Sequence, residues 1–201
     1  FARQISAQQA VLIHADTGEI LFGHNEHTRA PMASTTKIMT ALLVLERADL
    51  SATVTVSERA ASVEGSQLGL TAGEELSVRD LLYVLMMKSG NDAAYVVAAG
   101  VGAEISDDKS ITPHEAVEVF IDEMNKFARE NNMKGSHFTC PDGFHDDEHY
   151  TTMRDMFTVA RLSVQSDVIM KYTKTVEEKF YYVSGENITW TNTNALINPN
   201  S

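Results

Sequence analysis

One apolar stretch constrains the fold of this chain more than any other feature. In residues 35–48, large apolar side chains occupy most of the circumference of a helix: Ile38, Met39, Leu42, Leu43 and Leu45. Such a helix is buried, because it has no broad side to present to water. Other elements must therefore surround it, and 201 residues are enough to build that core.

A serine and a lysine stand at the head of this helix. Ser34 and Lys37 are three residues apart, so on a helix they share a face. A serine hydroxyl needs a base within hydrogen-bond reach to act as a nucleophile. Burial and a nearby helix N-terminus disfavour the charged form of a lysine, so a neutral Lys37 can accept the Ser34 proton. Taken alone, the Ser-x-x-Lys pattern also fits a helix N-cap followed by a surface lysine.

A second motif, Ser89-Gly90-Asn91, falls in the break between two predicted helices. Ser77 and Asp80 cap the first of these, and the second begins directly after the motif. A hydroxyl and an amide at such a turn can supply a proton relay and a donor that orients a carbonyl. In isolation the motif also fits an ordinary turn. The presence of both motifs in one chain favours an acyl-transfer site.

The remaining pattern predicts helices combined with antiparallel strands. Two β-rich runs, 9–14 and 20–22, flank an Asp-Thr-Gly turn, and 179–183 and 188–190 bracket a second turn at 184–187. Further helices are expected from Thr112 to about residue 131 and after a cap at Thr152. Residues 194–201 are expected to be loop-like. The fold class is therefore α+β.

Net charge limits the possible partners, cysteine content limits the possible disulfides, and hydropathy limits the possible membrane-spanning segments. Sixteen Lys and Arg against 28 Asp and Glu give a net charge of −12, which opposes nucleic acid or an anionic membrane as the main partner. The single cysteine, Cys140, excludes an internal disulfide and is expected to be a buried apolar side chain. No stretch reaches the roughly 18 apolar residues of a membrane-spanning helix. We expect any leader peptide to have been removed already or to lie outside the chain as given, and any peripheral membrane anchor to lie in segments outside this chain.

Several stretches together resemble one family, the serine D-alanyl-D-alanine carboxypeptidases, which are low-molecular-mass penicillin-binding proteins of the SxxK acyltransferase superfamily. The resemblance spans nearly the whole chain and is carried by residues 10–19, 31–41, 70–82, 88–94, 133–138 and 141–144. It implies a β-lactamase/transpeptidase-like fold, with an antiparallel sheet packed with helices, a mostly helical lobe, and the site between them.

The resemblance also implies roles for individual residues. Ser34 becomes the acylated nucleophile, whose N–H forms half of an oxyanion hole, and Lys37 becomes its base. Ser89 becomes a proton shuttle to the leaving D-alanine, and Asn91 a donor to the substrate carbonyl. The implied partners are peptidoglycan stem peptides ending in D-Ala-D-Ala and β-lactam antibiotics. The implied location is the bacterial cell envelope, outside the cytoplasmic membrane, and no cofactor is implied.

The chain departs from the family pattern in two places. The family's Lys-Thr-Gly strand binds the terminal carboxylate and supplies the other oxyanion N–H, but no stretch here matches it, and Lys174-Thr175-Val176 lacks the glycine. Asp142 and Phe144 stand where many relatives have His and Leu. We therefore expect residues 1–201 to form a single transpeptidase-like catalytic domain that is incomplete at its C-terminal end, with the missing strand beyond Ser201 or in a separate chain.

Three other interpretations of the sequence are alternatives to a carboxypeptidase. A serine β-lactamase would need a glutamate base for deacylation, but Glu64, Glu74 and Glu75 have no Glu-x-x-x-Asn context. A non-catalytic relative that binds penicillin or wall peptides would explain the missing motif, although the retained site residues argue against it. The run from His145 to His149 could hold a metal on a helix, but the preceding Pro and Gly favour a solvated acidic turn, so no metal is predicted.

Overall fold

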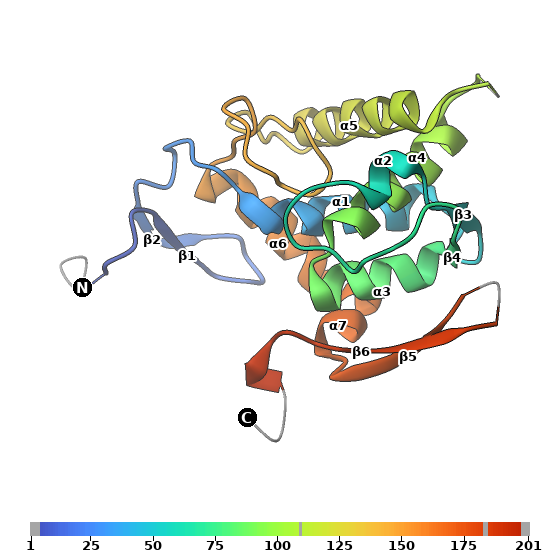
Figure 1. The fold of residues 1–201 in the computed structure, drawn as a ribbon. Coiled ribbons are helices and arrows are strands. Elements are labelled where there is room, and N and C mark those ends of the chain that lie inside the picture. Colours follow the sequence, from blue (N-terminus) through green and yellow to red (C-terminus); the bar gives the residue numbers. More distant parts are fainter. Residues whose placement is uncertain (1–4, 109, 183–184, 198–201) are drawn as a thin grey trace.

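The computed structural model describes residues 5–108, 110–182 and 185–197. Its centre is the helix that the apolar stretch predicts, α1, which packs against four other helices (Figure 1). Met39 and Leu43 on α1 are fully buried, which confirms the predicted burial of this stretch. The helices of this body are α1 (Thr36–Arg47), α3 (Val78–Lys88), α4 (Asn91–Ile105), α5 (Pro113–Glu130) and α6 (Met153–Gln165).

The predicted caps set the starts of these helices. The Ser77 hydroxyl accepts a hydrogen bond from the Asp80 N–H at the head of α3, and Thr152 does the same for Asp155 at the head of α6. Thr112 and Glu115 form a reciprocal capping box on α5. Each cap satisfies backbone N–H groups that the first turn of a helix leaves without an internal partner.

Several short elements had no clear sequence signal. They are β3 (Thr53–Thr55), α2 (Glu58–Ala61), β4 (Glu75–Ser77), α7 (Asp167–Lys174) and a 3₁₀ turn at Ala195–Ile197 within the predicted C-terminal loop. These elements are only three to eight residues long, which is too short for a hydrophobic period to stand out.

Both predicted hairpins form. The first pairs β1 (Ala10–Ile13) with β2 (Ile20–His24), and the second pairs β5 (Glu177–Tyr181) with β6 (Asn187–Thr191). Within the predicted second turn and the C-terminal loop, residues 184 and 198–201 lie outside the described residues.

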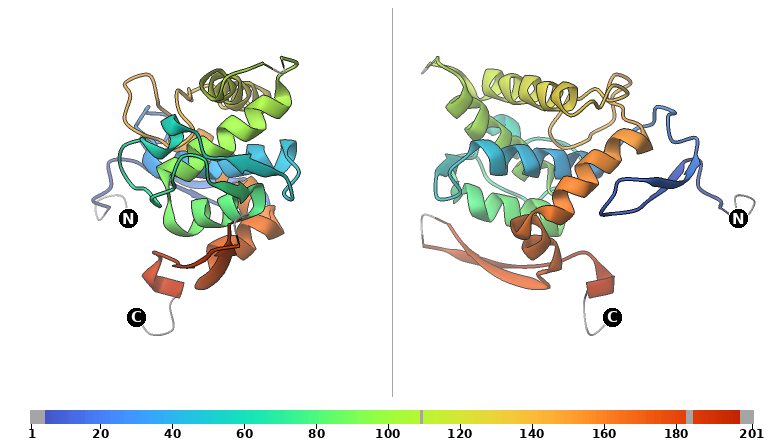
Figure 2. Two further views of the ribbon diagram at one scale, coloured as in Figure 1. Left: turned by 45° about the vertical axis from the view of Figure 1, so that its right-hand side comes forward. Right: turned by 180° about the vertical axis from the view of Figure 1, so that it is seen from behind.

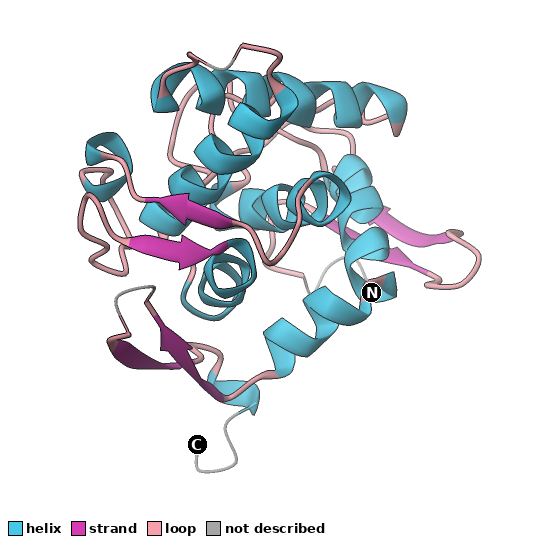
Figure 3. Ribbon diagram, turned by 90° about the vertical axis from the view of Figure 1, so that its right-hand side faces the viewer, coloured by secondary structure: helices cyan, strands magenta, loops and turns pink. Residues whose placement is uncertain are grey.

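The strands of the described residues do not join into one continuous sheet. The described residues contain three separate two-stranded antiparallel pairs, with β3 and β4 as the third. The β1–β2 hairpin lies beside α6, whereas β5–β6 lies near α3 and α7, across the helical body (Figure 2). Figure 3 shows the strands at the periphery of the helices. The α+β class holds, but no described strand bridges the hairpins.

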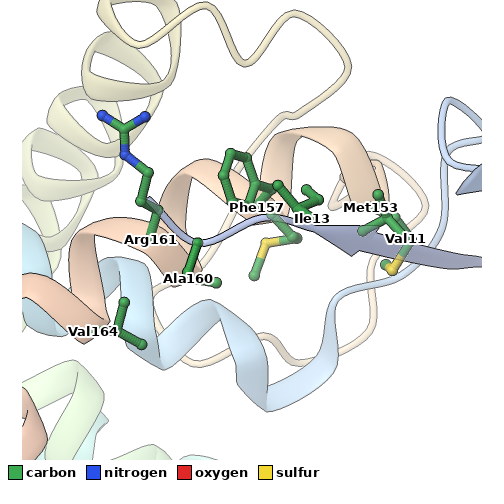
Figure 4. Close-up of a pocket in the computed structure, with 9 residues that line it drawn as sticks. Val11, Ile13, Met153, Phe157, Ala160, Arg161 and Val164 are labelled. Carbon is green, nitrogen blue, oxygen red and sulfur yellow. The ribbon is translucent and has the colours of Figure 1, made fainter. Parts of the chain in front are cut away.

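An apolar groove of about 350 Å³ separates β1 from α6 (Figure 4). Val11 and Ile13 line it from the strand, and Met153, Phe157 and Val164 line it from the helix. The side chain of Val164 is 58% exposed. The hairpin is therefore only partly covered, unlike the helical body. No helix in the described ranges is both long and apolar enough to cross a membrane.

Candidate active site

Ser34 lies in a short 3₁₀ turn, Ala33–Thr35, that leads directly into α1. Ala33 adopts a positive φ of 47°, and the Thr35 hydroxyl donates to the Met32 carbonyl at 2.5 Å. The turn presents the Ser34 side chain at the surface while α1 runs inward behind it. The nucleophile candidate is thus accessible to a large substrate and still has a rigid support.

Lys37 occupies the first turn of α1 and is only 2% exposed. Its Nζ atom donates to three oxygens, at 3.1 Å to Ser34 Oγ, 2.7 Å to Asn91 Oδ1 and 2.7 Å to the Asp142 carbonyl. We call this arrangement the Lys37 tripod. It brings together three segments that lie far apart in the chain.

The tripod determines where the lone pair of a neutral Lys37 would point. An amide oxygen and a backbone carbonyl only accept hydrogen bonds, so Asn91 and Asp142 would take the two N–H groups of a neutral amine. The remaining lone pair would then face the Ser34 hydroxyl. Burial lowers the pKa of Lys37, which favours this neutral form, while nearby acidic groups, with Asp142 first, oppose the shift.

Asn91 begins α4, and its amide is held in one orientation. Its Nδ2 donates to the Glu64 carbonyl at 2.6 Å, so Oδ1 must face Lys37. Its backbone N–H donates to the Ser66 carbonyl at 2.7 Å. These bonds join the loop after α2 to the head of α4.

The adjacent Asp92 is a functional neighbour that the sequence analysis did not single out. Its carboxylate is 1% exposed, and Oδ2 accepts the N–H groups of Leu68, Gly69 and Leu70 at 2.8, 3.0 and 3.2 Å. A buried carboxylate requires such donors. Asp92 therefore fixes the loop that holds Asn91. Its only sequence signal was its place directly after the Ser-Gly-Asn motif.

Ser89 caps the C-terminus of α3 in the left-handed region, with φ 60°. It lies two residues before Asn91, but its hydroxyl makes no hydrogen bond to any residue that the structure describes. The tripod thus joins three of the four predicted residues, and Ser89 precedes one of them, Asn91, by two residues. The shuttle role of Ser89 stays a prediction.

The loop over residues 139–149, called the 139–149 loop below, supplies the third acceptor of the tripod. The Thr40 hydroxyl on α1 donates to the Pro141 carbonyl at 2.6 Å, next to the carbonyl that Lys37 binds. Cys140 in this loop is buried, and burial raises the pKa of its thiol to about 12. Cys140 is therefore neutral, as expected of a packing residue.

The run from His145 to His149 is part of this loop. His149 is buried and uses both ring nitrogens in hydrogen bonds within the protein, whereas His145 is exposed and lies 3.8 Å from Asp147. Within the described ranges, no group of three His, Cys, Asp or Glu side chains could hold a metal ion.

Comparison with known proteins identifies the family of this chain. The family model Peptidase_S11, described as D-alanyl-D-alanine carboxypeptidase, matches residues 1–201. The chain is 36% identical over 197 residues to D-alanyl-D-alanine carboxypeptidase DacF of Bacillus subtilis, covering 95% of this chain and 47% of that protein. It is 32% identical over 206 residues to a D-alanyl-D-alanine carboxypeptidase of Streptomyces sp. strain K15, covering 96% of this chain and 68% of that protein.

A solved structure confirms the fold. The crystal structure of the Streptomyces K15 DD-transpeptidase superposes with a TM-score of 0.85 at 32% identity, over 98% of this chain and 77% of that one. The chain spans about half the length of the Bacillus relative. The α+β, transpeptidase-like fold and the family resemblance are both confirmed: this chain belongs to the D-alanyl-D-alanine carboxypeptidase family, Peptidase_S11.

Proposed function

We propose that this chain carries the nucleophile and base of a serine D-alanyl-D-alanine carboxypeptidase. The observation that carries the proposal is the Lys37 tripod, in which a buried amine faces the Ser34 hydroxyl at 3.1 Å with its other two hydrogen bonds fixed. A base at hydrogen-bond distance is what a serine nucleophile requires.

The acylation step follows from this geometry. Ser34 Oγ attacks the carbonyl carbon of the penultimate D-alanine while its proton passes to the neutral amine of Lys37. The carbonyl oxygen becomes an oxyanion, for which the Ser34 N–H is one proposed donor. The bond to the terminal D-alanine then breaks, and the proton returns to the leaving amine.

Ser89 and Asn91 are proposed to act on different parts of the substrate, the leaving D-alanine and a peptide carbonyl. Ser89 is only partly buried and lies two residues from Asn91, a member of the tripod, which supports its role as the shuttle that passes a proton to the leaving D-alanine. Asn91 is proposed to orient the peptide carbonyl of the substrate. Its Nδ2 already donates to Glu64, so only the second hydrogen of that amide remains for the substrate. Water then hydrolyses the ester on Ser34 and frees the enzyme.

The proposed substrates and location follow from family membership. Stem peptides of peptidoglycan that end in D-Ala-D-Ala are the proposed substrates, and β-lactams are the proposed acylating inhibitors. Peptidoglycan lies outside the cytoplasmic membrane, so we place the enzyme in the cell envelope. Peripheral anchoring to the membrane is proposed only for segments outside this chain.

We also propose that a Lys-Thr-Gly strand completes the catalytic domain. Two observations support this: relatives are longer than the chain, and the apolar groove between β1 and α6 remains open. A strand bridging the two hairpins would cover apolar side chains such as Val11. Sequencing the full gene product tests the idea, because a product without this motif would contradict it.

A DD-transpeptidase is a second candidate, favoured by the likeness to the Streptomyces K15 structure. The acyl-enzyme would be the same, but an amine of a second peptide would attack it in place of water. The β-lactamase interpretation gains no support, because the family model that matches this chain is that of a peptidase. A non-catalytic binder has no use for a buried amine aimed at a serine.

Intact-protein mass spectrometry after incubation with benzylpenicillin tests the proposal. We expect a covalent adduct on the chain and none on Ser34→Ala. D-alanine release from a D-Ala-D-Ala peptide by the full-length protein would separate the enzyme from a binder, and added glycine as an acceptor amine would reveal transpeptidation. Rapid penicillin hydrolysis would favour a β-lactamase. The absence of an adduct on the full-length protein would contradict the proposal.

A further inference from the structure

His149 lies behind the Lys37 tripod, at the end of the 139–149 loop, and is 3% exposed. Among the described residues, its hydrogen bonds go to Thr36, Thr139 and Cys140 and not to Lys37, so the mechanism above does not use it. It nevertheless connects the loop to α1, because one ring nitrogen lies 2.8 Å from Thr36 Oγ1, one residue before the lysine.

The hydrogen bonds of His149 fix its tautomer. The Thr139 backbone N–H donates to Nδ1 at 3.0 Å, so Nδ1 carries no proton. A neutral ring then has its proton on Nε2, which donates to the Thr36 hydroxyl. Burial lowers the pKa of His149 to about 4, although Asp142 and Asp146 oppose this and His137 adds to it. The ring therefore stays neutral near neutral pH and holds both bonds.

The middle of the loop lies directly against the turn that carries Ser34. A Cβ atom added to Gly143, which has φ 84°, would lie 1.9 Å from the Ala33 carbonyl oxygen and 2.8 Å from Thr36 Oγ1. The loop backbone can therefore approach this turn only because residue 143 is glycine. A loop packed this closely transmits a displacement at His149 to the Asp142 carbonyl.

We propose that His149 is a positioning residue that holds the Asp142 carbonyl on Lys37 and thereby keeps the lysine lone pair directed at Ser34. The effect of His149 on catalysis rests on the proposed function. The hydrogen bonds of His149 do not depend on that function. Without His149, Thr36 and the Thr139 N–H lose their partner, the loop loosens, and water reaches Nζ.

The first test measures the pKa of Lys37 in the absence of substrate. An NMR titration of ¹³C-labelled lysine, with the Lys37 signal assigned by its loss in Lys37→Met, compares the parent with His149→Ala and His149→Gln. We expect the pKa of Lys37 to rise in His149→Ala, because water relieves its burial, and to return toward the parent in His149→Gln, whose amide can both accept and donate. Ser34 and Asn91 bind Nζ, and Asp142, Cys140 and Asp92 act on its pKa electrostatically. All five residues are kept in the His149 variants.

The second test measures acylation by benzylpenicillin. We expect His149→Ala to slow acylation about 100-fold, as a small misplacement of a catalytic group does, and to move its acid limb to higher pH. Thr36→Val, which keeps the shape of the side chain and removes the hydroxyl, should slow acylation about fivefold to tenfold. His145→Ala, an exposed histidine in the same loop, is the control and should change neither readout.

The outcomes separate the two proposals. No acylation of the full-length parent would reject the proposed function, while the Lys37 titration would still decide the role of His149. An unchanged Lys37 pKa in folded His149→Ala and Thr36→Val would overturn the positioning role, even if both variants melt earlier. Should His149→Ala fail to fold, Thr36→Val decides the question alone.

Discussion

The Lys37 tripod and the β1–β2 hairpin are two regions of one molecule built in opposite ways. Around the tripod, buried polar groups such as Lys37 and Asp92 are held by several hydrogen bonds from distant segments. In the hairpin, large apolar side chains such as Leu12 and Leu21 are 56% and 55% exposed. The candidate catalytic residues are thus held by the tightly connected helical centre, whereas the partly exposed β1–β2 hairpin lies outside that centre.

The difference predicts different responses to mutation. Removing one member of a buried polar network leaves its partners without hydrogen bonds, at a cost of about 1–3 kcal/mol for each group. Shortening a half-exposed apolar side chain gives up little burial, so the cost is small. The predictions that follow test this contrast, starting with the largest expected effect.

Removing the base should have the largest effect. In Lys37→Met, we expect benzylpenicillin acylation to fall by a factor of about 10² to 10⁴, the usual contribution of a general base. Stopped-flow mixing followed by mass spectrometry measures the rate, and Lys134→Met, at an exposed lysine, serves as the control. Acylation at the parental rate in folded Lys37→Met would mean that another group takes the Ser34 proton.

Asp92→Asn should weaken the polar network around the tripod while leaving the tripod residues unchanged. The amide oxygen replaces a charged acceptor of three N–H groups, and hydrogen bonds to charged groups contribute more than neutral ones. We expect the free energy of unfolding in urea to fall by about 2–3 kcal/mol. Asp49→Asn, an exposed carboxylate that also accepts a backbone N–H, should change it much less. Equal losses at both sites would refute the contrast between buried and exposed networks.

Asp142→Asn should change the pH dependence of acylation. The Asp142 carboxylate raises the pKa of Lys37 against the stronger lowering effect of burial. Removing that charge lowers the pKa further, so the neutral amine persists to lower pH and the acid limb moves to lower pH. The backbone carbonyl and the acceptor for the Phe144 N–H both remain. Rates measured across pH on parent and variant check the direction, and a shift to higher pH would contradict it.

The hairpin should tolerate change. In Leu12→Ala, we expect a loss of less than about 0.5 kcal/mol in the free energy of unfolding, as at other exposed sites. Acylation should keep its parental rate. Leu43→Ala, at a fully buried position on α1, is the matched comparison and should lose about 2–5 kcal/mol. A clear loss of acylation in Leu12→Ala would show that the two regions are coupled.

Local signals predicted the local structure well. The cap at Ser77, the capping box at Thr112 and the Asp-Thr-Gly turn each depend on neighbouring residues, and the helices and hairpins they delimit all formed. The i, i+3 spacing of Ser34 and Lys37 likewise gave a hydrogen bond of 3.1 Å. The sequence did not show how the hairpins are placed relative to one another, because hairpin signals depend on neighbouring residues; in the described residues the strands form three separate antiparallel pairs.

The sequence by itself determined the buried central helix, the two chemical motifs and the family to which they belong. Only the tertiary structure decided what surrounds Lys37: the Asp142 carbonyl lies 105 residues away along the chain, and Asn91 lies 54 residues away. It also decided that Asp92, to which the sequence assigned no role, and His149, which the sequence suggested only as a metal ligand, anchor the loops behind the tripod. The physical reason is that a pKa and a lone-pair direction depend on burial and on acceptors from distant segments. Packing alone brings those acceptors together.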